Sequence, residues 1–166
     1  TLRVAKNAGA FLPRAVAALG FPIDVIAGRE EARLIYLGVS HVLPPGDAPR
    51  LVVDIGGGST EFIVGRGMQP ERLESLKLGC VTMSARFFGD GTLSKRAFDD
   101  AQTHAQAEVE AIAREFSRRH WREAYASSGT ALALADILEQ NGLSVAGITP
   151  DGLAKLRKRM IDAGHI

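Results

Sequence analysis

Apolar residues along the chain follow two alternating spacings, one typical of helices and the other of strands. Apolar positions three and four residues apart predict helices over residues 8–19, 29–42, 80–89, 94–116 and 131–139, and a last helix from Pro150 with Thr149 as its N-cap. Apolar and β-branched runs predict strands over residues 22–28, 51–55, 62–64, 72–79 and 121–130. This alternation is typical of the α/β class.

Composition places the chain among ordinary globular proteins. Of its 166 residues, 46% are hydrophobic and 23% charged, and the net charge of +1 favours neither nucleic acid nor an acidic partner. The single cysteine, Cys80, excludes an internal disulfide, so a reducing cytoplasm is the simplest setting. No apolar run approaches the roughly 18 residues that a membrane span needs. Because the chain starts without methionine and stops inside a predicted helix, we expect a piece of a longer protein.

The stretch LVVDIGGGSTEFIVG, residues 51–65, is the strongest candidate for chemistry. Glycines at the tip of a predicted hairpin expose backbone N–H groups, and glycine permits the positive φ angles that let successive N–H groups converge on an anion. Ser59 and Thr60 add hydroxyl donors, and Asp54 and Glu61 are placed to hold Mg²⁺ or orient water. The stretch lacks the dinucleotide and Walker A patterns. Taken alone, it is equally well interpreted as a glycine-rich turn with exposed acids.

Other candidates are weaker. A buried structural thiol is the favoured interpretation of Cys80. The histidines lack metal-ligand spacing and are interpreted as structural or surface residues; they are His41, His104, His120 and His165. The basic run Lys155–Arg159 is typical of a solvated helix face, with guidance of a polyanion as the alternative.

Three separate motifs carry a resemblance to a known family. DIGGGSTEFIVG resembles the second phosphate loop of the superfold of actin and the sugar kinases. Together with GREEARLIYLGV upstream and ASSGT downstream, it is similar to the exopolyphosphatase and guanosine pentaphosphate phosphohydrolase family. The resemblance implies a ribonuclease H-like α/β fold with a mixed sheet flanked by helices. Residues 1–34 would end the first ribonuclease H-like domain, and residues 35–166 would form most of the second.

The same resemblance implies roles for individual residues. Asp54 and Glu61 match acids that handle Mg²⁺ and water, with K⁺ as a further activator, and Glu31 matches the glutamate taken as the catalytic base. The implied phosphate-binding residues lie on two loops and are Gly56, Gly57, Gly58, Ser59, Thr60, Ser128, Gly129 and Thr130. In the second loop many members have glycine before alanine, which this sequence lacks.

The implied activity is hydrolysis of terminal phosphoanhydride bonds in the cytoplasm. The substrate would be inorganic polyphosphate or guanosine pentaphosphate, the latter linked to the stringent response, and the full-length protein would form a homodimer without a nucleic acid partner. Two alternatives remain open: an ATP-dependent kinase of the same superfold, and a non-catalytic nucleotide-binding or actin-like assembly module. Because the first phosphate loop of the family does not occur here, we expect these 166 residues alone to be inactive.

Helical periodicity bears on whether Glu30 or Glu31 is the base. Neighbouring residues on a helix point about 100° apart, so both cannot face one cleft squarely. Glu31 shares a stripe with Ile35 and Val39, which predicts a buried side where desolvation would raise its pKa. Glu30 shares a stripe with Leu34, so the preference is modest. Alternatively, both acids simply favour the first turn of a helix.

Overall fold

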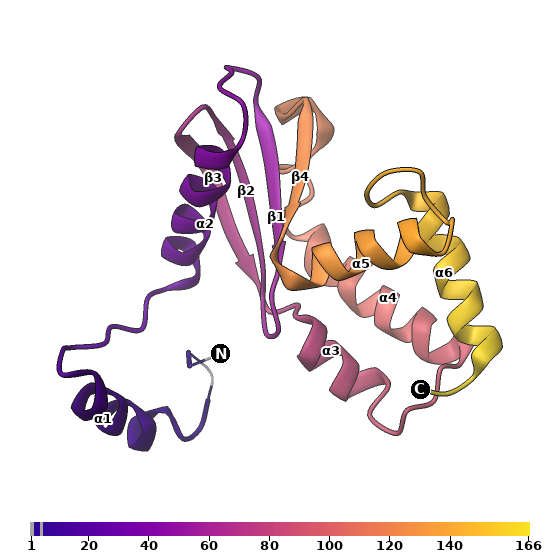
Figure 1. Cartoon of the computed structure of the whole chain (residues 1–166), viewed down its shortest axis with the longest axis horizontal. Coiled ribbons are helices and arrows are strands. Elements are labelled where there is room, and N and C mark those ends of the chain that lie inside the picture. Colours follow the sequence, from indigo (N-terminus) through magenta and orange to yellow (C-terminus); the bar gives the residue numbers. More distant parts are fainter. Residues whose placement is uncertain (1, 4) are drawn as a thin grey trace.

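The computed structural model describes residues 2–3 and 5–166, which form a four-stranded mixed sheet flanked by helices (Figure 1). Its elements in chain order are α1 (Ala8–Leu19), α2 (Gly28–Val42), β1 (Arg50–Ile55), β2 (Thr60–Arg66), β3 (Gln69–Leu76), α3 (Cys80–Phe87), α4 (Lys95–Glu110), the 3-10 turn η1 (Arg118–His120), β4 (Glu123–Ser127), α5 (Ser128–Gln140) and α6 (Pro150–Ala163). The strand order is β3-β2-β1-β4. β2 runs antiparallel to β1 and β3, whereas β4 runs parallel to β1. The α/β fold predicted from the sequence is confirmed.

The two faces of the sheet bury separate apolar clusters, because successive side chains of a strand point to opposite faces. On one face, Ala32 and Tyr36 of α2 pack against Val52 and Ile63, all fully buried. The other face buries Leu51 and Val64 against Ile112 and Phe116, which follow α4. Figure 1 shows α2 on one side of the sheet and α3 to α6 on the other. The hairpin β1–β2 is therefore covered on both faces.

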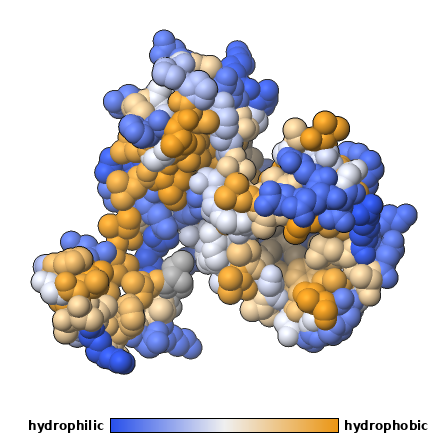
Figure 2. Space-filling view, viewed as in Figure 1, coloured by the Kyte–Doolittle hydropathy of each residue, from blue (hydrophilic) through white to orange (hydrophobic). Residues whose placement is uncertain are grey.

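Helix α1 lies apart from this core (Figure 1). None of its twelve residues, all of them described, is buried. Phe11 is 48% exposed, and Phe21 in the following segment is 58% exposed. Figure 2 shows apolar side chains gathered over α1 and the segment that leads to α2. The domain boundary expected after residue 34 falls within α2, and the division into two domains stays a prediction.

Several predicted elements differ in detail from the structure. The strand predicted over 22–28 is wrong: residues 22–27 are irregular, and no described strand pairs with them. β3 begins three residues earlier than predicted, because Gly67 at φ 51° allows a tight turn that pairs Arg66 with Gln69. The helix predicted to reach residue 116 ends at Glu110, and turns carry the next apolar residues onto the sheet. Every described helix is too short or too polar to cross a lipid bilayer.

The sheet core generates a first prediction. Replacing fully buried Ile63 by alanine removes packing against Tyr36 and Val52, and should lower the free energy of unfolding by about 2–5 kcal/mol. Leu132 on α5 is 67% exposed, so Leu132→Ala should change it by less than about 0.5 kcal/mol. Urea denaturation of both variants measures the difference, and equal losses would contradict the assigned core.

Candidate functional site

The candidate site is built on the register of the β1–β2 hairpin. Asp54 lies directly opposite Glu61, and Ile55 opposite Thr60, so the loop Gly56–Ser59 alone joins the two strands. Residues opposite one another in an antiparallel pair project to the same face. Asp54 and Glu61 therefore share the face that α2 covers. The sequence prediction of a hairpin with two acids flanking a glycine loop is confirmed.

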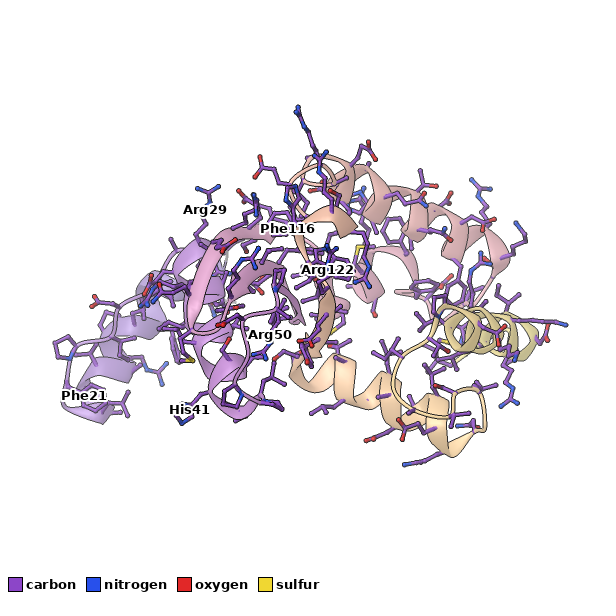
Figure 3. All side chains as sticks on the ribbon, turned by 90° about the horizontal axis from the view of Figure 1, so that it is seen from above. Phe21, Arg29, His41, Arg50, Phe116 and Arg122 are labelled. Carbon is purple, nitrogen blue, oxygen red and sulfur yellow. The ribbon has the colours of Figure 1, made fainter. Side chains whose placement is uncertain are left out.

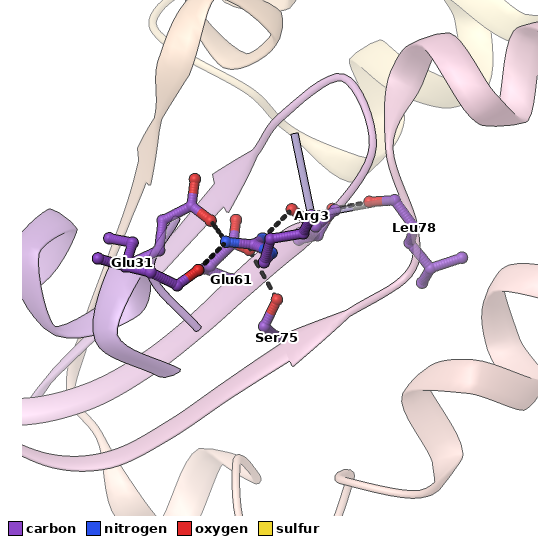
Figure 4. A network of polar contacts seen from close by, with 8 residues as sticks. Arg3, Glu31, Glu61, Ser75 and Leu78 are labelled. Atoms are coloured by element: carbon purple, nitrogen blue, oxygen red, sulfur yellow. Dashed lines mark hydrogen bonds and ion pairs between the residues drawn. The ribbon is translucent and has the colours of Figure 1, made fainter. Parts of the chain in front are cut away.

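Glu61 is the most buried acid of the site, with 1% of its surface exposed. Ser75 of β3, its partner across the sheet, donates a hydrogen bond of 2.7 Å to Oε1 of Glu61. Arg3 approaches the same oxygen with Nη2 at 3.6 Å and donates to Oγ of Ser59 at 3.3 Å. Its Nη1 pairs with the carboxylate of Glu31 at the start of α2 (Figure 4). One guanidinium thus links acids from a helix and a strand.

The environment of Glu61 disfavours its negative charge. Burial raises the pKa of the Glu61 carboxyl, hydrogen bonds from Ser75 and Ser59 lower it, and the nearby acids Glu31 and Asp54 raise it again, with a net increase. Functional sites commonly contain a carboxyl group with a raised pKa that lies in a cleft beside other acids.

The glycine loop is tied to the start of α3 by its carbonyl groups. The carbonyl of Gly56 accepts from the N–H of Cys80 at 2.9 Å, and that of Gly57 accepts from Val81 and Thr82 at 3.0 and 3.1 Å. Within the described residues, no acceptor receives the N–H groups of residues 57, 58 and 59. These three N–H groups are therefore free for another acceptor, as a phosphate cradle would require, and their contact with phosphate stays a prediction.

The expected conformation of the loop glycines is wrong. None of the three glycines has a positive φ angle. Close approach instead requires glycine at position 79, where a Cβ would lie 2.3 Å from backbone atoms of Gly57 and Gly58. Thr60 is also committed to structure, since its hydroxyl donates to the carbonyl of Leu78 at 2.5 Å (Figure 4). Thr60 is therefore a support of the loop and not a free donor.

A pocket of about 510 Å³ opens beside the loop. Gly58 and Ser59 line it from the loop and Ser75 from β3. Its charged lining residues come from four segments and are Arg3, Arg29, Glu74 and Lys77. Arg3 pairs with Glu31 and Arg29 with Glu74, so Lys77 is the lining cation without an ion-pair partner among the described residues and can attract an anionic ligand.

The second predicted loop lies next to the first but does not line this pocket. Ser128, the only described residue other than glycine with a positive φ (83°), donates to the carbonyl of Ile55 at 2.6 Å. Thr130 contacts Sγ of Cys80 through its hydroxyl at 3.3 Å. A Cβ at Gly129 would meet no heavy atom within 4 Å. Residues 128–130 therefore brace the end of β1, and their contact with phosphate stays a prediction.

The structure separates Glu30 from Glu31. Glu30 points to solvent and pairs with Arg33 through two hydrogen bonds of 2.9 and 2.7 Å, which lower the pKa of Glu30. Glu31 instead joins the network of Arg3. The burial expected at Glu31 is wrong, since its side chain is 36% exposed and the desolvated acid is Glu61.

The chemistry of these donors fits a magnesium ion that shares its ligands with a substrate. In the part of the chain that the structure describes, no three His, Cys, Asp or Glu side chains form a metal site by themselves. Mg²⁺ is commonly held by one or two carboxylates together with phosphate oxygens and water. Asp54 and Glu61 supply such a pair, and a cation would offset both the burial that chiefly raises the pKa of Glu61 and the smaller repulsion from its neighbouring acids.

Sequence reasoning missed two members of the site, Arg3 and Ser75. Ser75 could have been found from the β2–β3 pairing, because it faces Glu61 directly. No local pattern around Arg3 indicates its role, since it reaches Glu31 and Ser59 across 28 and 56 residues of sequence.

Comparisons with known proteins bear on both fold and family. The profile of the Ppx/GppA phosphatase family matches residues 1–165. A solved exopolyphosphatase-like protein is 28% identical with a TM-score of 0.76, and the Aquifex aeolicus PPX-GPPA enzyme is 29% identical with a TM-score of 0.65; each match covers 84% of this chain and 44% of the other. An exopolyphosphatase from Cytophaga hutchinsonii, 24% identical with a TM-score of 0.69, shares the fold over 99% of this chain and 55% of its own.

These matches confirm the ribonuclease H-like, actin-like fold that the sequence resemblance implies. The chain spans about half of the length of the solved structures that it matches.

Burial of Glu61 predicts a pH-dependent stability difference. The pKa of Glu61 is higher in the folded state than in the unfolded state. The contribution of Glu61 to the free energy of unfolding therefore falls as pH rises from its unfolded pKa through its folded pKa. Glu61→Gln keeps an acceptor for Ser75 without the charge, so its melting temperature should exceed the wild-type value at pH 7 to 8. The advantage should vanish near pH 4, where Glu61 is protonated in both states.

Thermal denaturation against pH measures this difference, with Glu110→Gln as the control. Glu110 is exposed at the end of α4, so its variant should follow the wild-type curve. The expected direction would be contradicted if the melting temperature of Glu61→Gln minus that of wild type were lower at pH 8 than at pH 4.

Close packing of Gly79 predicts a further stability effect. The Cβ of Gly79→Ala would overlap backbone atoms that cannot rotate away, which should cost about 1–3 kcal/mol and displace the loop. Gly129→Ala has open space within α5 and should leave stability unchanged or raise it by up to about 1 kcal/mol. Urea denaturation compares the two variants, and amide chemical shifts of Gly57 and Gly58 report the loop. Wild-type shifts in Gly79→Ala would show that this contact does not shape the loop.

Proposed function

Because the chain belongs to the Ppx/GppA phosphatase family, we propose that its protein hydrolyses terminal phosphoanhydride bonds. The substrate is inorganic polyphosphate, which releases orthophosphate, or guanosine pentaphosphate, which is converted to the tetraphosphate. One observation carries the proposal: a pocket with unpaired loop N–H donors and Arg3 adjoins the carboxylates Glu31 and Glu61. Phosphoryl transfer to water needs both kinds of group, donors for the phosphoryl oxygens and a carboxylate for the attacking water.

The terminal phosphoryl group binds at the glycine loop in this proposal. Its oxygens accept from the N–H groups of residues 57–59, which the fold holds in place through the α3 contacts. Arg3, Arg29 and Lys77 line the same pocket and offset the charge of the substrate. Donors fixed before the reaction stabilise charge that develops during it without reorganising.

Binding of the phosphoryl group also frees the proposed base. In the structure Glu31 is paired with Arg3. Phosphoryl oxygens compete for the same guanidinium, so substrate draws Arg3 away and leaves the Glu31 carboxylate able to accept a proton. Water then attacks the terminal phosphorus, its proton passes to Glu31, and the bond from phosphorus to the bridging oxygen breaks. The products are orthophosphate and a chain shorter by one phosphate.

Asp54 and Glu61 would hold Mg²⁺ beside this pocket, and two carboxylates on one face of the hairpin, Glu61 buried and Asp54 half-buried, fit a cation. When bound, Mg²⁺ offsets charge on the phosphoryl oxygens. Ser75 orients Glu61 through its hydrogen bond in either case.

Two other assignments are less well supported. An ATP-dependent kinase of the same superfold would need an adenine pocket, and a non-catalytic module would not need the Glu31–Arg3–Glu61 arrangement. We further propose a cytoplasmic setting, from the single cysteine, and a homodimer of the complete protein, from the family resemblance.

The role of Glu31 predicts a large loss of turnover. In the complete protein that contains this chain, Glu31→Gln should lower kcat for orthophosphate release by at least about 10²-fold, the usual scale for a general base. Glu30→Gln should change kcat much less, because Glu30 pairs with Arg33 at the surface. Release of orthophosphate from polyphosphate, guanosine pentaphosphate and ATP measures both the base and the substrate class.

Different outcomes would contradict different parts of the proposal. The reverse ranking of the two variants would move the base to Glu30, and near-normal rates for both would remove α2 from the mechanism. Phosphate transfer from ATP to an acceptor, without hydrolysis of polyphosphate or guanosine pentaphosphate, would favour the kinase.

A further inference from the structure

The segment 111–122 after α4 is rigidly anchored and strongly basic. Ile112 and Phe116 are buried against the sheet, and Phe116 packs edge-on against Phe62 with ring centroids 6.0 Å apart. The indole of Trp121 donates to the carbonyl of Phe116 at 2.8 Å. The outward-facing residues of the segment carry four positive charges against one negative charge, and they are Arg114, Glu115, Arg118, Arg119 and Arg122.

Part of this segment forms a second pocket, of about 370 Å³, against the edge strand β3. The residues that line it are Arg72, Arg114, Glu115, Arg119 and His120. Arg119 donates only to neutral acceptors, Nε2 of His120 at 3.1 Å and the carbonyl of Arg114 at 3.3 Å. Within the described chain, no carboxylate lies at ion-pair distance from Arg114 or Arg119, and Arg72 reaches Glu71 only at 3.9 Å.

Several other basic residues of the molecule are neutralised by neighbouring acids. Of the run Lys155–Arg159, Lys155 pairs with Asp151 at 2.6 Å and Arg157 with Asp99 at 2.5 Å. Within the described residues, Lys158 and Arg159 of the same run have no carboxylate partner, so they keep the unneutralised charge that guidance of a polyanion requires. The pocket at β3 has this charge although its arginines are dispersed in the sequence.

The second pocket adjoins the candidate site along β3. Arg72 lines it on the face of the sheet that the segment 111–122 covers, whereas Ser75 lines the site pocket on the face of α2. Three residues of the edge strand, or about 10 Å of backbone, separate Arg72 from Ser75, so the two pockets open on opposite faces at one edge of the sheet. Arg29 stands between them: its guanidinium pairs with Glu74, and Glu115 adds to the electrostatic field that raises the pKa of Arg29. Figure 3 shows Arg29, from α2, and Phe116, which anchors the basic segment on the other face of the sheet.

We propose that this pocket, defined by Arg72, Arg114, Arg119 and His120, is a second anion subsite that holds a distal part of a linear polyphosphate chain. The proposal rests on the proposed function, since the terminal phosphate of the same chain lies at the glycine loop. A linear polyanion carries charge along its whole length, so it can contact both pockets across the edge of β3. Once one pocket is occupied, contact with the second is intramolecular and strengthens binding of long chains only.

A matched pair of double variants in the complete protein tests the subsite. Arg114→Gln with Arg119→Gln should raise KM for long-chain polyphosphate by about 2- to 30-fold, the range expected for two exposed ion pairs. Its kcat, and its KM for tripolyphosphate, should stay unchanged because the site pocket is intact. The control, Arg96→Gln with Lys158→Gln, removes two exposed charges from α4 and α6 and should leave both KM values unchanged.

An equal rise of KM for tripolyphosphate and for the long chain would overturn the subsite, as would the same effect in the control variant. If the complete protein hydrolyses neither substrate, the proposed function fails, and the subsite is judged by binding alone. Fluorescence anisotropy of labelled long-chain polyphosphate should then show weaker binding to the Arg114→Gln, Arg119→Gln variant than to wild type at low salt. Equal binding, or equal competition by an oligonucleotide of matched charge, would overturn it.

Discussion

The antiparallel register between β1 and β2 is the constraint on which the candidate site depends. It sets Asp54 opposite Glu61 and leaves four residues to close the loop. A slip of one residue would turn every side chain of a strand to the opposite face. The register is fixed because both faces are buried, Val52 and Ile63 beneath α2 and Leu51 and Val64 beneath the segment after α4. The packing that stabilises the sheet therefore also determines the geometry of the acids.

Holding the acids in this arrangement lowers the free energy of unfolding. Glu61 is buried within the field of two other carboxylates, and hydrogen bonds offset only part of that cost. Ser128 adds a backbone conformation that side chains rarely adopt, and its hydroxyl closes onto the end of β1. Such features persist where the surrounding structure over-determines them, and they gather at functional sites. Here the sheet with its two apolar clusters holds these unfavourable features in place.

Sequence reasoning succeeded where the site is encoded in adjacent residues. The hairpin is one continuous stretch, so spacing alone placed Asp54 and Glu61 on either side of the glycine loop. Arg3 and Ser75 could not be found in this way, because they reach Glu61 through strand pairing and through a segment outside the sheet. The strand predicted over 22–28 failed for a related reason: an apolar pattern does not say whether a partner strand is available.

The absence of buried residues in α1 gives the site two parts of unequal local stability. Asp54 and Glu61 lie on central strands, whose backbone hydrogen bonds open only with the sheet, whereas Arg3 precedes a helix that the core does not hold. Elements with few buried apolar contacts open locally at a lower free energy than the core. The carboxyl groups of Asp54 and Glu61 therefore keep their positions as long as the sheet is folded. Local opening of the segment that carries Arg3 would remove the countercharge and leave both carboxyl groups in place.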